Sequence, residues 1–296
     1  MTIVKSAACA ILVLACPGVS AQDYEIRMSR PMKVGEKYEL TASGSKSKRM
    51  TTSVQGQVVK EDKSSFTAKL EGTITVLEVD ERGQEQKITL TVSKCVMSVN
   101  GDADEKEALT EGTEVVAQLR DGEEVFLIDD KPAPSDIEEM LDLFSTLPTT
   151  KVTGDDMFGT KERKKVGDSW AINSTAAARG FDAGKGTKVE PENIKGSTKL
   201  EKVLVVDGSK CLQLLGRMEI SEFVLPMPPG FSVEKANVSL DSLGELPVDT
   251  SIGHLSQAMN MTMTVSIKGK PSPDAPEVTI SVSVAMSKQE KRKLLK

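Results

Sequence analysis

The stretch that decides the fold class is Met259-Asn260-Met261-Thr262-Met263-Thr264-Val265-Ser266-Ile267, in which apolar and polar residues alternate without a break. Residues 278–286 repeat the alternation, with Val278, Ile280 and Val282 on the apolar parity. A two-residue period places alternate side chains on opposite faces of a strand. The two stretches therefore predict two strands, each with one apolar face. They are joined by the proline-rich residues 271–276, most simply as an antiparallel pair.

Similar alternation occurs earlier in the chain. The apolar residues from Phe66 to Val76 share one parity, and residues 61–64 (Glu-Asp-Lys-Ser) predict a turn before them. The apolar parity then changes between Val92 and Cys95, which predicts a β-bulge. Asp121-Gly122, between two short apolar runs, predicts a hairpin. Residues 288–296 are mostly charged and are expected to be a frayed tail.

One segment has a helical period. Ser135 and Glu138 have capping-box spacing, and apolar residues follow at helical intervals until Pro148. We therefore expect an amphipathic helix at about 135–147, whereas the glycine-rich residues 176–196 show little periodicity and are expected to be mobile. The predicted fold class is mainly β (α+β). The helix packs on a curved antiparallel sheet, or on one of two related antiparallel halves.

An echo within the chain favours two halves. Residues 33–38 (Lys-Val-Gly-Glu-Lys-Tyr) and 165–170 (Lys-Val-Gly-Asp-Ser-Trp) share a basic, valine, glycine, acidic, polar, aromatic order. This predicts an N-terminal β half at 22–150, ending in the helix, and a C-terminal β half at 151–296. The two halves can also form one continuous domain.

The N-terminus has the features of an export signal. Lys5 precedes a short apolar run, and a small-residue pattern predicts cleavage between Ala21 and Gln22, with 1–21 as the signal peptide. The alternative is a lipoprotein-type cut with a lipid anchor on Cys16. We expect the mature chain to be exported to the periplasm or the extracellular space. No later stretch has the roughly 20 apolar residues of a membrane-spanning helix.

Charge and cysteine content narrow the function classes. The formal net charge is −6, which argues against a general nucleic-acid partner. Cys95 and Cys211 remain after the predicted cleavage and permit one disulfide. The alternative is two buried free thiols.

A search for catalytic motifs finds none. The single histidine, His254, and the absence of a close cysteine pair argue against a metal site, and no metal or cofactor is expected. No serine lies in a G-x-S-x-G motif, and no glycine pattern matches a phosphate loop. The sequence therefore favours a protein that is not an enzyme, with a hydrolase as a minor alternative.

The order of elements resembles a group of uncharacterised exported bacterial β-rich proteins. The residues that carry the likeness are Gly35-Glu36-Lys37-Tyr38, the helix end at Leu143–Pro148 and Val166-Gly167-Asp168-Ser169-Trp170. The plan is also loosely similar to periplasmic lipoprotein carriers, whose curved antiparallel sheet holds acyl chains against helices. These resemblances imply no catalytic residue.

The expected function is that of a non-enzymatic cell-envelope protein, either a binding or a structural module. The alternative is a carrier of lipid or another apolar ligand, so an apolar small molecule or another envelope protein is the expected partner. The apolar stripes at the C-terminal end would then line the pocket, since methionine-rich surfaces adapt to irregular apolar ligands. The candidate ligand-binding residues are Met259, Met261, Met263, Val265, Ile267, Val278, Ile280 and Val282.

Overall fold

The computed structural model describes residues 22–144, 147–182, 186–272 and 274–295. The predicted signal peptide at 1–21, with Ala21 of the cleavage site and Cys16 of the alternative anchor, lies outside the described residues. Within them, a single antiparallel sheet of 13 strands contains every named strand. The mainly β fold class is thus confirmed.

The elements of the described residues are as follows. The first group of strands is β1 (Lys37–Val54), β2 (Gln57–Val79), β3 (Glu85–Val99), β4 (Lys106–Leu109), β5 (Glu114–Arg120), β6 (Glu123–Ile128) and β7 (Lys131–Pro132). The second group is β8 (Ser169–Ala171), β9 (Ile194–Val206), β10 (Ser209–Ser221), β11 (Phe231–Pro247), β12 (Ser256–Gly269) and β13 (Val278–Leu294). The helices are α1 (Ser135–Phe144), α2 (Gly154–Phe158), α3 (Ser174–Phe181) and the short 3-10 turn η1 (Pro191–Asn193).

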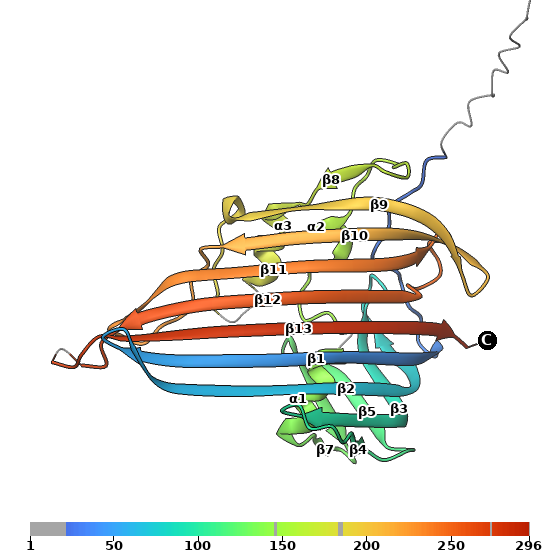
Figure 1. Ribbon diagram of the computed structural model, residues 1–296. Helices are drawn as coiled ribbons and strands as arrows, with labels where there is room; N and C mark the ends of the chain where they lie inside the picture. Colours follow the sequence, from blue (N-terminus) through green and yellow to red (C-terminus); the bar gives the residue numbers. More distant parts are fainter. Residues whose placement is uncertain (1–21, 145–146, 183–185, 273, 296) are drawn as a thin grey trace, which may run out of the picture.

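The two groups of strands join through the first and the last long strand. The order across the sheet is β7-β6-β5-β3-β2-β1-β13-β12-β11-β10-β9-β8, with β4 paired to β3 at the side. β1 and β13 pair along their whole length, from Tyr38 opposite Leu294 to Val54 opposite Val278 (Figure 1). The two sequence halves therefore share one continuous sheet.

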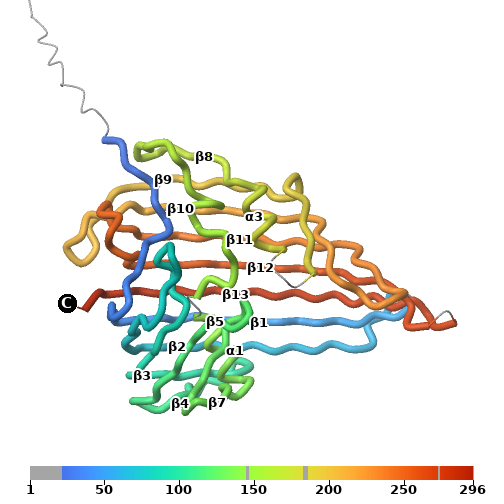
Figure 2. The backbone as a smooth tube through the Cα atoms, turned by 180° about the vertical axis from the view of Figure 1, so that it is seen from behind, coloured from blue at the N-terminus to red at the C-terminus, as the bar shows by residue number. Residues whose placement is uncertain are grey.

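The helices lie on one face of this sheet. Figure 2 shows this face, with α1 beside β1 and β2 and α3 beside β10 and β11. Buried side chains of α1, including Met140 and Leu141, form one core cluster with side chains of β1, β2, β3 and β5. A second cluster joins Ala177 and Ala178 of α3 to β9–β12. The two clusters are therefore packed separately on this face, one on each side of the central strands of the sheet.

The N-terminal segment, residues 22–36, crosses the same face from the β9 side to the start of β1 (Figure 2). Tyr24 and Ile26 are buried against Leu200, Leu212 and Leu214, in a third cluster. We call residues 22–36 the strap. It spans the strands that separate the two larger cores.

Several predicted elements are confirmed. β12 and β13 pair antiparallel, with Val265 opposite Val282. Asp121 and Gly122 both have positive φ between β5 and β6, as a tight hairpin turn requires. The parity change before Cys95 is a bulge, because the β2–β3 register shifts there. The amphipathic helix is α1, which begins at Ser135.

Three local predictions are wrong, and one strand is missing from them. Residues 61–64 lie inside β2, and the turn is instead at Gln55-Gly56, where both φ angles are positive. Residues 288–294 are not a frayed tail but the paired end of β13. Residues 176–196 contain most of α3, η1 and the start of β9 rather than one irregular segment. The strand β11 was not predicted.

The sequence echo corresponds to one turn used twice. Gly35 and Gly167 have φ angles of +86° and +94°, a region that favours glycine. The carboxylates of Glu36 and Asp168 each accept a hydrogen bond from the backbone N–H three residues earlier, at 2.8 Å in both cases. The same short motif therefore starts the first strand of each half, β1 and β8.

The two cysteines do not form the disulfide that the sequence permits. Both are buried and free. Cys95 lies on β3 and Cys211 on β10, with five strands between them in the sheet. At about 4.8 Å per strand this separation greatly exceeds the roughly 6 Å that a disulfide spans. The alternative of two buried thiols is the one observed.

Candidate ligand-binding cavity

A cavity of about 440 Å³ lies between the strap and the strands β10–β13. Its walls come from residues 28–38 of the strap and β1, from the turn before β3, from α2, and from the loop between β11 and β12. This volume falls in the range of roughly 300–1,000 Å³ that is typical of small-molecule sites. A second cavity, of about 250 Å³, lies between β9, β10, β11 and β12.

Most of the wall is apolar. The apolar lining side chains come from the strap, α2, β10–β12 and the end of β13, so they surround the cavity on several sides. They are Met28, Met32, Met157, Phe158, Leu214, Leu240, Leu243, Leu246, Ile252, Leu255, Met259 and Leu294. Methionine, leucine and phenylalanine offer no strong hydrogen-bond partner, so this wall suits a hydrocarbon surface.

Hydrogen bonds hold the strap over the cavity. The Asp155 carboxylate accepts from the backbone N–H of Met28 at 2.6 Å and of Ser29 at 3.1 Å. Further along, the Met32 N–H donates to the Gly83 carbonyl at 2.8 Å. The strap is therefore tied to α2 on one side and to the β2–β3 turn on the other.

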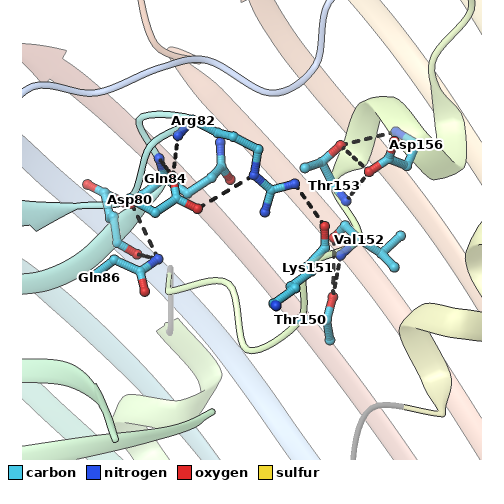
Figure 3. A network of polar contacts seen from close by, with 10 residues as sticks. Asp80, Arg82, Gln84, Gln86, Thr150, Lys151, Val152, Thr153 and Asp156 are labelled. Atoms are coloured by element: carbon cyan, nitrogen blue, oxygen red, sulfur yellow. Dashed lines mark hydrogen bonds and ion pairs between the residues drawn. The ribbon is translucent and has the colours of Figure 1, made fainter. Parts of the chain in front are cut away.

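A polar network links the β2–β3 turn, whose Gln84 lines the cavity, to the segment before α2 (Figure 3). The Asp80 carboxylate accepts from the backbone N–H of Arg82 and Gln84, both at 2.8 Å. Arg82 then reaches out of this turn and donates from Nη1 to the Lys151 carbonyl at 2.9 Å. The contact links the β2–β3 turn to the segment that leads into α2, where Thr153 forms a capping box with Asp156.

The position of Phe158 follows from two further bonds. Its carbonyl accepts from Trp170 Nε1 at 2.8 Å and from Thr198 Oγ1 at 2.9 Å. Thr198 is fully buried on β9. The chain's single tryptophan therefore serves as an anchor for the end of α2, which places the Phe158 ring in the cavity wall.

One end of the cavity is charged. Glu290 on β13 is almost fully buried, and its carboxylate lies 2.6 Å from His254 Nε2 and 3.2 Å from Arg292 Nη2. The Arg292 guanidinium also stacks over the Tyr38 ring, 4.8 Å from its centre. Tyr38 donates to the buried Glu85 at 3.1 Å. His254, Arg292, Tyr38 and Glu85 line the cavity directly.

The pKa values in this group are shifted in opposite directions. Burial opposes the ionisation of Glu290, but Arg292, His254 and Lys288 outweigh it and hold the Glu290 pKa below its usual range. Burial raises the pKa of Glu85, and the Arg292 charge offsets this only in part. Burial and the Arg292 charge together lower the pKa of His254 despite its bond to Glu290. Glu290 and Arg292 are therefore both charged at neutral pH.

Arg30 lies on the strap in another part of the cavity wall. It is 7% exposed, and it donates from Nη1 to the Asp249 carbonyl at 3.0 Å and from Nη2 to the Pro247 carbonyl at 2.9 Å. Burial lowers the pKa of Arg30, although arginine stays protonated at any physiological pH. The strap thus places the buried guanidinium of Arg30 beside the β11–β12 loop.

The predicted binding residues lie on one face of β12 and β13, but only one of them lines this cavity. Met259 does so. Met261, Met263 and Ile267 are half-buried and pack, together with the buried Val265, in the α3 core cluster. Val278, Ile280 and Val282 are half-buried further along β13 and are absent from the cavity lining.

Several lining residues were not predicted. The sequence analysis assigns Arg30 no role, and it places Arg292 and Glu290 in the tail that is expected to be frayed. One signal was present for the latter pair: Lys288, Glu290 and Arg292 continue the even parity of Val278 to Met286. For Arg30 no local pattern exists, because its partners are more than 200 residues away.

Comparisons with known proteins add little. No family model and no curated protein matches the chain. Among solved structures, it is similar to lipovitellin (TM-score 0.34, 7% identity), covering 86% of this chain but only 25% of lipovitellin. It is also similar to the outer membrane protein OprG from Pseudomonas aeruginosa (TM-score 0.21, 7% identity, 89% and 98% covered).

A third similar structure is a LolA-superfamily protein from Nitrosomonas europaea (TM-score 0.15, 8% identity, 89% and 90% covered). Scores this low support no conclusion about function. The two resemblances drawn from the sequence stay predictions. In the part of the chain that the structure describes, no helix is both long and apolar enough to cross a bilayer.

Proposed function

We propose that this protein is an exported binding protein that holds one apolar or amphipathic small molecule beneath the strap. The observation that carries the proposal is the cavity of about 440 Å³, with its mostly apolar wall. Transfer of apolar ligand surface out of water contributes roughly 25 cal/mol per Å², so a wall of this kind favours hydrocarbon over water. The export signal proposed for residues 1–21 would place this function in the cell envelope.

The way in which the strap is held over the cavity favours ligand exchange. The strap has few buried side chains at its cavity end, and backbone-to-side-chain bonds with Asp155 hold it there. Such contacts open at lower free energy than a packed core does. Movement of residues 28–32 would uncover the cavity, and no buried residue of the two larger core clusters lies in this segment, although Met32 packs against the first of them.

We also propose that the protein does not act chemically on its ligand. The only histidine is bonded to Glu290, and no serine or cysteine of the described residues is hydrogen-bonded to His254. The nucleophile and base pair that acyl-transfer enzymes need is therefore missing from this part of the cavity.

A titration with the neutral fluorescent probe N-phenylnaphthylamine tests the binding proposal. We expect a saturable rise in fluorescence with the detergent-free protein, and loss of affinity by about tenfold or more in Met259→Trp, which fills the cavity. Met263→Trp is the matched control. It lies on the same face of the same strand outside the cavity, so its affinity should stay close to that of the parent.

The outcome that contradicts the proposal is equally clear. If Met259→Trp and Met263→Trp bind the probe like the parent protein, the probe is held elsewhere on the sheet. If the parent protein does not bind it at all, and native mass spectrometry of protein from its own envelope shows only polypeptide mass, a structural or protein-binding role remains.

A further inference from the structure

The feature that goes beyond an apolar pocket is the charge of Arg30. A guanidinium has five N–H donors and a full positive charge. At 7% exposure, Arg30 is more than nine-tenths buried, yet its two printed partners are the backbone carbonyls of Pro247 and Asp249. Its Nε is buried and has no hydrogen-bond partner among the described residues.

No carboxylate compensates this charge at contact distance. Within the described residues, no carboxylate oxygen lies within the 4.0 Å of an ion pair with Arg30. The two acids that influence it most are both engaged elsewhere. Asp155 accepts from two backbone N–H groups of the strap, and Asp249 accepts from the backbone and hydroxyl of Ser251.

Arg292, the other arginine of the cavity wall, differs from Arg30 because it has an ion-pair partner. Both arginines line the cavity, and both have a buried Nε without a partner in the described part of the chain. Arg292, however, is paired with Glu290 at 3.2 Å, and Glu85 is held by Tyr38. Arg30 is therefore the arginine of the cavity wall that has no ion-pair partner at contact distance among the described residues.

A role as a mechanical clamp does not account for a cation here. The two carbonyl oxygens would accept equally well from a neutral amide, and a buried charge costs several kcal/mol unless it is paired. Strong compensation comes from an anion that accepts charge-assisted, preferably bidentate, hydrogen bonds. The apolar side chains of the cavity wall favour hydrocarbon in the rest of such a molecule.

We propose that the ligand is an anionic amphiphile, with a carboxylate or phosphate head group on a single hydrocarbon chain, and that Arg30 binds the head group while the apolar wall holds the chain. This rests on the proposed binding function and adds the ligand class to it. A volume of about 440 Å³ lies in the lower part of the usual range for ligand sites, which favours one chain over a two-chain lipid.

The test compares three probes that share one chain: dodecanoate, dodecyl phosphate and dodecanol. Each displaces N-phenylnaphthylamine from the detergent-free protein, below the concentration at which it aggregates. We expect at least one of the two anions to bind about tenfold to a hundredfold more tightly than dodecanol, as charge-assisted hydrogen bonds imply. The better of the two anions identifies the head group.

Two variants assign the preference to Arg30. In Arg30→Gln, the preference for the anion should fall to within about twofold, while dodecanol affinity stays near that of the parent protein. Arg30→Lys, which keeps the charge but loses the planar fork, should keep part of the preference. Arg27→Gln is the matched control, since Arg27 is on the same strap but is exposed and pairs with Glu25.

The results separate the two proposals. If dodecanol and both anions bind the parent protein equally, the anionic head group is wrong and the apolar cavity stands. If the anions are preferred but Arg30→Gln keeps that preference, Arg30 is not the residue that binds them. If no probe binds, the proposed function fails first. The comparison in the parent protein needs no variant, so it decides the head-group charge even if Arg30→Gln does not fold.

Discussion

Glu290 is the residue on which the charged end of the cavity depends. It is 3% exposed and contacts His254 and Arg292, which come from the β11–β12 loop and from β13 itself. Loss of its charge would remove the ion-pair partner that Arg292, whose side chain is 11% exposed, has in the described residues. Removal of one partner of a buried ion pair typically costs about 3–5 kcal/mol.

We therefore predict that Glu290→Gln lowers the free energy of unfolding by about 3 kcal/mol or more, measured by urea denaturation at neutral pH. Glu39→Gln is the control. Its partner Lys293 lies 3.0 Å away on the same pair of strands, but both side chains are more than half exposed, so the loss should stay under about 1 kcal/mol. Equal losses in the two variants would contradict the assigned role of burial.

The same residue predicts an acid dependence. The pKa of Glu290 is lower in the folded protein than the value of about 4.3 in an unfolded chain. Its stabilising contribution is therefore complete above that value and is lost as the pH falls below it. The raised pKa of Glu85 changes stability with pH in the opposite direction, so the effect of Glu290 is read from a direct comparison of the parent protein with Glu290→Gln. We expect the difference in unfolding free energy between the parent and Glu290→Gln to shrink below about pH 4.

The thiols allow another test at this scale. Cys95 and Cys211 are almost fully buried, and burial raises the pKa of both, that of Cys95 to about 11. Since the thiolate is the reactive form, iodoacetamide should label neither cysteine in the native exported chain and both after unfolding in urea. Mass spectrometry counts the labels. A native mass two hydrogens too low, with no labelling after unfolding, would instead indicate a disulfide.

At the scale of elements, the turn repeated at residues 33–38 and 165–170 allows the cost of backbone strain to be measured without a side-chain clash. A Cβ added to Gly35 or Gly167 would meet no atom within 4 Å, yet both residues have a strongly positive φ. Gly35→Ala and Gly167→Ala should therefore each cost about 1–2 kcal/mol from backbone strain alone. Thermal unfolding measures this. Ser43→Ala, on β1 at an ordinary strand position, is the control and should change stability by less than about 0.5 kcal/mol.

The strands that can be predicted from the sequence are those with one buried face. β12, β13 and the middle of β2 have one covered face, so their side chains alternate and the strands were found. Residues 57–64 of β2 are exposed or nearly so on both faces, which removes the two-residue signal and led to the wrong turn at 61–64. The true turn, Gln55-Gly56, has the positive φ angles but not the usual asparagine or aspartate.

The cavity was less predictable than the sheet, for a different reason. Charged residues are rarely buried, so composition alone gives no reason to place Arg30, Glu290 and Arg292 in a cavity wall or beside it. Their burial depends on contacts between distant segments, such as Arg30 with Pro247, and a local pattern contains no information about these. Only Met259 was identified from sequence, because an apolar strand face signals burial whatever covers it.

At the scale of the whole molecule, the sheet depends on the pairing of β1 with β13, which unites the two sequence halves. The last residues of β13 pair with the start of β1, from Gly44 opposite Lys288 to Tyr38 opposite Leu294. They also flank the buried Tyr38, Leu40 and Ala42 and supply Glu290. The C-terminal end of the chain is therefore a central part of the sheet and of the cavity.

We predict that a chain ending at Ser287 loses cooperative folding. Exposure of the buried side chains at the start of β1 and loss of Glu290 should together cost at least about 5 kcal/mol, which is comparable with the roughly 5–15 kcal/mol that stabilises a typical domain. A chain ending at Leu294 keeps every β1–β13 pair and should melt like the full exported chain. Circular dichroism during heating distinguishes the two. If the shorter chain keeps the parent melting temperature, residues 288–294 are dispensable to the sheet, and the two halves must be stable without the end of the strand that joins them.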